Sequence, residues 1–161
     1  MSFAVPAPLE ARLDELTTHY PQKRSASLMF LHALQEHFGH ISAEAVEWTA
    51  RKLGLTPINV HELVTFYPMF RQQPAGRHGI KVCRTLSCAL GGSGQLHQHF
   101  CTKLGLDPHG HGLQTTPDGR FSVEFVECLA SCGTAPVMMC NEEFYEAVSP
   151  VKADEILAKC K

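Results

Sequence analysis

Two short-spaced cysteine pairs, separated by residues 89–127, constrain this chain more than any other feature. Cys83-x4-Cys88 follows the apolar run 80–82, and Cys128-x3-Cys132 follows an alternating run that ends at residue 126. Each pair stands where a predicted strand gives way to small and turn-forming residues, which is where a rigid scaffold presents ligands. If the fold brings the two segments together, four thiolates can bind one metal centre.

Composition narrows the classes of protein to which the chain can belong. With a formal net charge of −2, the chain lacks the excess of positive charge that attracts nucleic acid or an anionic membrane surface, so we expect it to bind neither. No apolar run approaches the roughly 20 residues that span a bilayer, and the first residues lack the pattern of a secretory signal. Seven cysteines cannot all pair within the chain, so we expect a reducing compartment.

Residues 1–75 have the spacing of a small helical domain followed by a linker. Gly39 and Gly54 stand where helices are expected to end, and Ser42 and Thr56 where helices are expected to begin. Apolar residues recur at helical intervals in four stretches, at about 9–18, 25–38, 43–53 and 57–67. The polar stretch 71–79, with one proline and two glycines, predicts the connector.

The segment Thr65-Phe66-Tyr67-Pro68-Met69-Phe70 is harder to bury completely. It holds three aromatic residues and a methionine next to a proline. Composition alone leaves two interpretations open: the segment either closes the small helical core or forms a docking surface for a partner.

Residues 76–161 change to a mixed pattern of strands and helices. The predicted order is a strand at 80–82, a helix carrying Leu96 and Phe100, a strand at 121–126, a hairpin and a final helix capped by Ser149. This order is thioredoxin-like. The whole chain is therefore predicted as an α+β protein, in which an N-terminal helical bundle precedes a thioredoxin-like α/β domain.

Two metal centres remain possible for the four cysteines. Neither pair has the Cys-x-x-Cys spacing of a disulfide oxidoreductase, so thiol–disulfide catalysis is disfavoured. Structural zinc also takes four thiolates, and short spacings suit it, but a thioredoxin-like domain has its own core and needs no metal to fold. A [2Fe–2S] cluster takes the same four ligands and is large enough for each pair to bind one iron.

The residues around the cysteines suit a cluster. Small and hydroxyl residues between and after the ligands let backbone N–H groups approach the sulfur atoms, although turns are rich in such residues for other reasons. Arg84 is expected to add a positive charge beside the ligands. These features support a cluster but leave zinc open.

Three segments carry a resemblance to a known family. They are Phe66-Tyr67-Pro68-Met69-Phe70, Val82-Cys83-Arg84-Thr85-Leu86-Ser87-Cys88, and the segment from Glu127 to Pro136 that contains Cys128-Leu129-Ala130-Ser131-Cys132-Gly133-Thr134-Ala135. Together they resemble the small [2Fe–2S] subunit of the NADH-oxidising module of respiratory complex I. The subunit has relatives in NAD-dependent hydrogenases and formate dehydrogenases. The resemblance extends over nearly the whole chain.

The resemblance implies that Cys83, Cys88, Cys128 and Cys132 ligate one [2Fe–2S] cluster. It also implies an electron-transfer subunit of NADH:quinone oxidoreductase, which takes part in the enzyme's reaction but is not catalytic alone. FMN and NADH would be bound by a partner flavoprotein subunit, since this chain has no dinucleotide-binding glycine fingerprint. The expected location is cytoplasmic, in the peripheral arm of a complex at the inner face of the cell membrane.

Three alternatives to this function stay open. The first is the equivalent diaphorase subunit of a hydrogenase or formate dehydrogenase, and the second is a zinc-stapled interaction module. The third is a free thioredoxin-like ferredoxin, which the helical half disfavours because a soluble carrier needs no such appendage.

The remaining cysteines and histidines are predicted to play no part in the centre. Cys101, Cys140 and Cys160 are expected to pack as inert core cysteines. A second group of potential metal ligands is expected to be solvated, because four cysteines suffice; it consists of His97, His99, His109 and His111.

Overall fold

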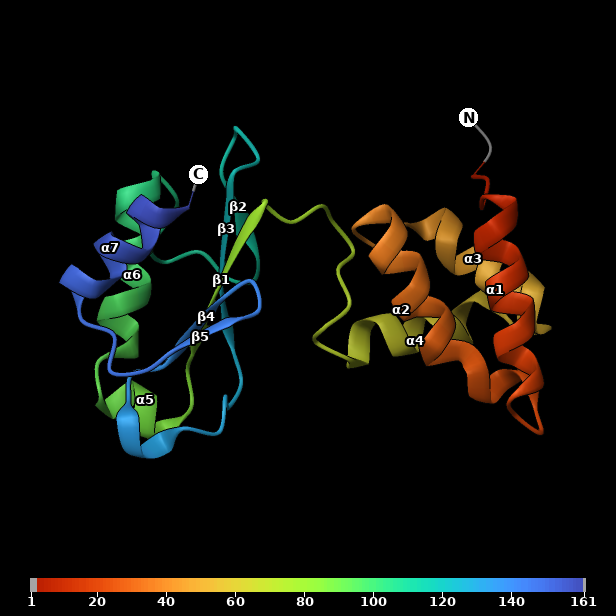
Figure 1. Cartoon of the computed structure of the whole chain (residues 1–161), viewed down its shortest axis with the longest axis horizontal. Helices are drawn as coiled ribbons and strands as arrows, with labels where there is room; N and C mark the ends of the chain where they lie inside the picture. Colours follow the sequence, from red (N-terminus) through yellow and green to blue (C-terminus); the bar gives the residue numbers. More distant parts are fainter. Residues whose placement is uncertain (1–2, 161) are drawn as a thin grey trace. The chain divides into compact units, whose positions relative to one another are not determined.

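The computed structural model describes residues 3–160, which form two compact units that divide between Pro74 and Ala75 (Figure 1). The first unit is helical, and the second contains a mixed sheet with helices. The predicted α+β class is confirmed. Each unit has its own buried core.

Helices build the N-terminal unit around one apolar centre. Its elements are α1 (Ala7–Thr18), the 3-10 turn η1 (Lys23–Ala26), α2 (Ser27–Phe38), α3 (Ala43–Leu53) and α4 (Pro57–Phe66). The largest fully buried side chains include Leu13, Phe30, Leu31, Leu34 and Val60, which come from three of the helices. Their burial explains the helical spacing of apolar residues in this half of the sequence.

The predicted helix ends are confirmed at four positions, at one of them without a side-chain cap hydrogen bond. Gly39 and Gly54 adopt left-handed backbone conformations, with φ of 80° and 70°, directly after α2 and α3. The Ser42 hydroxyl accepts a hydrogen bond of 3.2 Å from the Ala45 N–H. Thr56 is the N-cap residue of α4, but its hydroxyl accepts no hydrogen bond from the helix and donates to Asn59 Oδ1 at 2.8 Å.

The aromatic segment 65–70, which includes the end of α4, is partly buried and partly exposed. Phe70 is buried and Tyr67 packs against the helical core. Phe66 is 77% exposed and Met69 is 46% exposed. The same six residues therefore close the core and present apolar surface to solvent.

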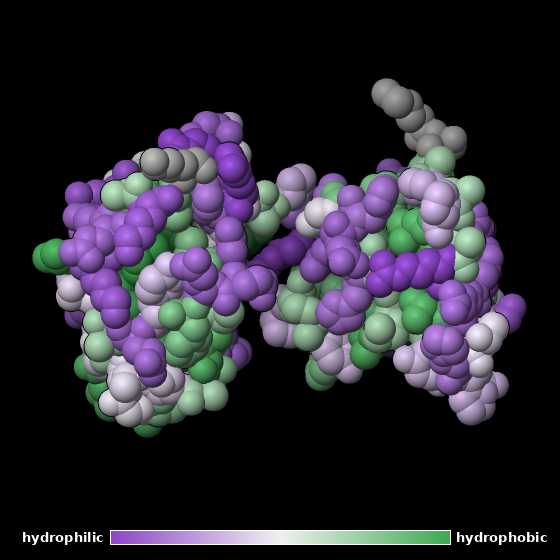
Figure 2. All heavy atoms as spheres, in the orientation of Figure 1, coloured by the Kyte–Doolittle hydropathy of each residue, from purple (hydrophilic) through white to green (hydrophobic). Residues whose placement is uncertain are grey.

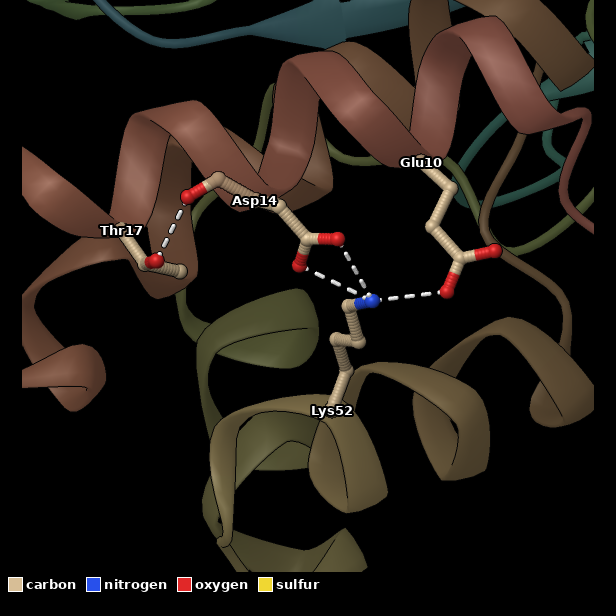
Figure 3. Close-up of polar contacts among 4 residues, drawn as sticks. All are labelled: Glu10, Asp14, Thr17 and Lys52. Atoms are coloured by element: carbon tan, nitrogen blue, oxygen red, sulfur yellow. Dashed lines mark hydrogen bonds and ion pairs between the residues drawn. The ribbon is translucent and has the colours of Figure 1, made fainter.

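One polar contact joins α1 to α3 across the surface of the helical core (Figure 3). Lys52 Nζ lies 2.7 Å from Glu10 Oε1 and 2.9 Å from Asp14 Oδ1, and its side chain is only 24% exposed. Glu10 and Asp14 are one turn apart on α1 and would repel one another without the ammonium between them. The contact therefore holds two helices and neutralises a like-charge pair.

A five-stranded sheet forms the centre of the C-terminal unit. Its strands are β1 (His78–Cys83), β2 (Gln114–Thr115), β3 (Phe121–Val126), β4 (Met138–Cys140) and β5 (Glu143–Tyr145), in the order β2-β3-β1-β4-β5. The helices α6 (Ser93–Leu104) and α7 (Pro150–Lys159) lie on the same side of the sheet (Figure 1). The core between them includes Phe100, Val123, Met138 and Ile156.

Strand β1 is parallel to β3 on one side and antiparallel to β4 on the other. The β1–β3 register runs from His78 opposite Phe121 to Cys83 opposite Val126. The β4–β5 hairpin turns at 141–142, close to the predicted position. Ser149 accepts a hydrogen bond from the Lys152 N–H and caps α7 as expected.

Some elements of this unit do not follow from sequence periodicity. Two of them are the five-residue helix α5 (Leu86–Leu90) and the 3-10 turn η2 (Cys132–Thr134), so Cys88 and Cys132 lie in short helical turns. The two-residue strand β2 was likewise too short to be predicted. Within residues 3–160, no helix combines the length and apolar character needed to cross a membrane.

Replacing Lys52 with methionine should lower the free energy of unfolding of the N-terminal unit by about 1 kcal/mol. Methionine keeps much of the aliphatic stem but leaves Glu10 and Asp14 without their cation. Urea titration followed by the fluorescence of Trp48, the single tryptophan, reports on this unit. The loss should shrink in high salt, which screens the repulsion between the carboxylates.

The matched control is Arg51→Met on the same helix. Arg51 pairs with Glu47 at 3.8 Å, and both side chains are more than 60% exposed. This variant should cost less than about 0.5 kcal/mol. Equal losses for the two variants would show that the contact of Lys52 with α1 adds nothing beyond an ordinary surface ion pair.

Candidate metal centre

The in-register pairing of β1 with β3 brings the two cysteine segments to one edge of the sheet. Parallel strands end at the same edge, and Cys83 is the last residue of β1, opposite Val126 at the end of β3. Cys128 follows two residues later. The Arg84 N–H continues this pairing with a hydrogen bond of 3.0 Å to the Val126 carbonyl oxygen.

The other neighbour of β1 brings in the chain that follows the second pair. The Cys83 N–H donates to the Val137 carbonyl oxygen at 3.1 Å. Cys83, Cys88 and Val137 form a small buried cluster, against which Leu129 and Ala135 pack. Helix α5 contacts η2, and the two lie together at one end of the unit (Figure 1). Both cysteine segments are therefore in direct contact.

A close approach at Gly91 supports the same packing. A Cβ placed on Gly91 would lie 2.9 Å from Ala135 Cβ and 3.2 Å from the Ala135 backbone carbon. The chain after the first pair therefore passes the chain after the second pair too closely for any larger residue. Gly91 is therefore required here for the close packing of the two segments.

The first cysteine pair is buried. Cys83 and Cys88 are each 1% exposed. Burial disfavours the Cys83 thiolate, but hydrogen bonds from the Thr85 hydroxyl and the Leu129 backbone outweigh it and lower the pKa of the Cys83 thiol. Cys83 Sγ and Thr85 Oγ1 are 3.3 Å apart. Burial raises the pKa of Cys88, and the neighbouring Cys83 raises it further.

The second cysteine pair is exposed. Cys128 Sγ and Cys132 Sγ lie 3.9 Å apart. The Ala130 N–H donates to Cys128 Sγ at 3.3 Å, and this bond, followed by one from Cys132, lowers the pKa of the Cys128 thiol. Ala130 has a φ of 62°, a left-handed conformation that is uncommon outside glycine. In this conformation the Ala130 N–H points at Cys128 Sγ.

Arg84 places its positive charge beside the candidate ligands as expected, but that charge is paired with a carboxylate. Its guanidinium Nε lies 2.9 Å from Glu127 Oε1, and Nη2 contacts the same oxygen. Arg84 directly follows Cys83, and Glu127 directly precedes Cys128. The ion pair therefore links the two segments and largely cancels the charge of the arginine.

Glu146 anchors the second pair from another element. Its Oε1 accepts hydrogen bonds from Ser131 Oγ at 2.5 Å and Thr134 Oγ1 at 2.7 Å, on either side of Cys132. These two bonds, Ser131 first, lower the pKa of the Glu146 carboxyl. No sequence signal indicated this role, because Glu146 lies between β5 and α7, far along the chain from its partners. The sequence shows Glu127 next to Cys128, but it does not show that Glu127 pairs with Arg84.

The donor set of the two segments fits an iron–sulfur cluster. Within each segment, the two thiols of the pair are in contact with one another. Backbone N–H and hydroxyl donors point at Cys83 and Cys128. Such donors stabilise thiolate ligands and the sulfur atoms of a cluster. Among residues 3–160, no three His, Cys, Asp or Glu side chains are arranged around a single metal-ion position.

The histidines are only partly as predicted. His109 and His111 are exposed as expected. His97 is 2% exposed and its ring stacks on Phe125 with the centroids 4.0 Å apart, so the prediction that it is solvated was wrong. Its burial, which lowers the pKa of the imidazole, follows from its place on the inner face of α6. His99 is partly buried and contacts Asp154 at 2.7 Å.

The three other cysteines lie outside the centre. Cys101 is fully buried in the core of the unit, as predicted. Cys140, on β4, is 7% exposed, whereas Cys160, directly after α7, is only half-buried. The sulfur atoms of Cys140 and Cys160 lie 3.8 Å apart, which sequence spacing did not indicate.

Known proteins similar to this chain include NADH-quinone oxidoreductase subunits of two bacteria. The one from Aquifex aeolicus is 35% identical over 157 residues, covering 98% of this chain and 96% of the relative. The one from Thermus thermophilus is 39% identical over 149 residues, covering 91% of this chain and 80% of the relative. The similarity therefore extends over both units.

A solved structure shares the fold. The NAD+-reducing [NiFe]-hydrogenase in its air-oxidized state matches with a TM-score of 0.66 at 23% identity. The match covers 81% of this chain but only 22% of the hydrogenase chain, so it demonstrates a common fold alone.

The family model for thioredoxin-like [2Fe–2S] ferredoxins matches residues 13–161, which include both cysteine pairs and most of the helical unit. The description of that family names a [2Fe–2S] cluster, and the sheet, the two thiol pairs and their hydrogen-bond donors agree with it. This chain is therefore a member of the thioredoxin-like [2Fe–2S] ferredoxin family.

Proposed function

We propose that this chain is the electron-transfer subunit of an NADH-quinone oxidoreductase, in which Cys83, Cys88, Cys128 and Cys132 ligate one [2Fe–2S] cluster. The observation that carries the ligand assignment is the register of β1 and β3, which brings both pairs to one sheet edge. The assignment to the oxidoreductase is supported by relatives of that name, which match more than nine-tenths of the chain.

A cluster at this edge would accept and release one electron at a time. The chain's own residues would hold it in place. The buried pair, Cys83 and Cys88, is fixed by β1 and α5, and the exposed pair, Cys128 and Cys132, is fixed by Glu146 and by the Arg84–Glu127 ion pair. Thr85 and the N–H of Ala130 would donate to ligand sulfurs and favour the more negative, reduced state.

The electron donor would be the FMN of a partner flavoprotein subunit that also binds NADH. Helix α5 presents Leu86 and Leu90 to solvent, 75% and 82% exposed, beside the cysteine segments. Figure 2 shows apolar surface at the end of the unit where α5 lies. Exposed apolar residues next to an exposed ligand pair suit a docking surface over which electrons pass. Such a surface would suit a place in the peripheral arm of a complex, at the inner face of the cell membrane.

The second candidate is the equivalent diaphorase subunit of an NAD-dependent hydrogenase or formate dehydrogenase. The fold shared with the hydrogenase agrees with it. The relatives at 35% and 39% identity favour the quinone-reducing enzyme.

Affinity purification of the tagged chain from its native cell tests the assembly. The expected result is co-elution of a flavoprotein with NADH-dehydrogenase activity, together with quinone-reducing subunits. Co-elution with a hydrogenase or formate dehydrogenase would favour the second candidate. Recovery of the cluster-loaded chain without any flavoprotein would contradict both.

Serine substitutions test the ligands. Cys83→Ser and Cys132→Ser should each abolish or strongly alter the visible absorbance and reduced-state EPR signal of the reconstituted protein, because each removes one thiolate from an iron. One substitution lies in the buried pair and the other in the exposed pair, so the two together test both segments.

Cys160→Ser is the matched control, since it replaces a half-buried cysteine of the same unit. It should retain the cluster spectrum. If all three variants gave the same spectrum, the proposed ligand set would be wrong.

A further inference from the structure

Two cysteines outside the proposed cluster ligands have adjacent sulfur atoms. Cys140 is the last residue of β4 and Cys160 directly follows α7, and their Sγ atoms lie 3.8 Å apart. A disulfide needs a sulfur–sulfur distance of about 2.05 Å. Each sulfur would therefore have to move by about 1 Å, and Cys160 can contribute because it lies beyond the last helical residue.

The two thiols differ in their access to solvent. Cys140 is 7% exposed, and burial, followed by the nearby Cys160 and Glu143, raises the pKa of its thiol to about 12. Cys160 is half-buried, and its sulfur lies 3.4 Å from the Ile156 carbonyl oxygen. Because a thiolate must be exposed to attack a solvent species, Cys160 is the first to react and Cys140 the second.

A cavity of about 280 Å³ gives access to the pair. Cys140 and Cys160 both line it, together with His78, Tyr145 and Lys159. Lys159 is exposed and lines the same cavity, so its ammonium favours the approach of an anionic disulfide compound. The pair is therefore open to a small reactant from solvent.

We propose that Cys140 and Cys160 form a redox-active dithiol that is oxidised to a disulfide by a small-molecule disulfide such as glutathione disulfide. The bond would close the segment 140–160 and tie the end of α7 to β4. Strand β4 follows Cys132 in the chain, so the disulfide would fix this strand, and with it the chain that leaves the second cysteine pair, to the end of α7. The inference is independent of the cluster and of the proposed assembly.

The reaction proceeds in two exchange steps. In the first, the Cys160 thiolate attacks one sulfur of glutathione disulfide, whose S–S bond breaks and releases one glutathione, which takes up the proton lost by Cys160. In the second, Cys140 attacks the Cys160 sulfur of the mixed disulfide and releases the second glutathione, which takes up the proton of Cys140. Two protein thiols lose two electrons, and one small disulfide gains them.

The test equilibrates the anaerobic, cluster-loaded full chain with glutathione buffers that range from fully reduced to fully oxidised. Free thiols are blocked with N-ethylmaleimide, and peptide mapping then assigns each cysteine. The wild type should contain a Cys140–Cys160 disulfide whose fraction rises with the glutathione disulfide ratio. Cluster absorbance measured in parallel shows whether the ligand cysteines have reacted.

Three variants separate the proposed roles. Cys140→Ser should stop at the mixed disulfide and accumulate glutathione on Cys160, whereas Cys160→Ser should form neither the adduct nor the disulfide. Cys101→Ala, which removes a fully buried cysteine whose sulfur lies near the ring of His97, should behave as the wild type.

Two results would overturn the proposal. One is a folded wild type that, after incubation in fully oxidised buffer, contains no disulfide between Cys140 and Cys160, for example because N-ethylmaleimide still alkylates both thiols. The other is a glutathione adduct on Cys140 of the Cys160→Ser variant at the level seen on Cys160 of Cys140→Ser, which would refute the order of attack.

Discussion

The parallel register of β1 with β3 determines the geometry of the candidate metal centre. It places Cys83 opposite Val126 and thereby brings two distant segments of the sequence to one edge of one sheet. On its other side, β1 pairs with β4, so the chain beyond the second cysteine pair returns to the same place. A shift of one residue in either pairing would turn alternate side chains to the opposite face and separate the thiols.

Polar contacts hold the segments that the sheet brings together. The Arg84–Glu127 ion pair joins the residues next to Cys83 and Cys128, and Glu146 fixes the hydroxyls beside Cys132. Buried apolar contacts hold the first pair, whereas hydrogen bonds at the surface hold the second. The site therefore has a buried inner side and an exposed outer side that a partner can approach, as the proposed electron transfer between subunits would need.

Much of the fold could be predicted from the sequence because local chemistry specifies it, whereas contacts between distant segments could not. Gly39, Gly54, Ser42 and Ser149 mark helix ends through conformations or hydrogen bonds that involve only neighbouring residues. Short elements such as α5 and β2 escaped prediction because five or two residues contain no measurable period. At the candidate centre, the two cysteine pairs could be recognised in the sequence. The ion pair of Arg84, the hydrogen bonds of Glu146 and the burial of His97 could not, because each depends on a partner from another element. For the same reason, sequence spacing did not reveal the contact of Cys140 with Cys160.

The proposed function requires the four thiols to hold a binuclear iron–sulfur cluster and not a structural zinc ion. Elemental analysis of the anaerobically reconstituted chain, with assay of acid-labile sulfide and EPR after reduction, distinguishes the two centres. We expect about two irons and two sulfides per chain, with a reduced-state EPR signal from a single [2Fe–2S] cluster. One zinc per chain, with no sulfide and no EPR signal, would contradict the proposed function and indicate a zinc-stapled interaction module.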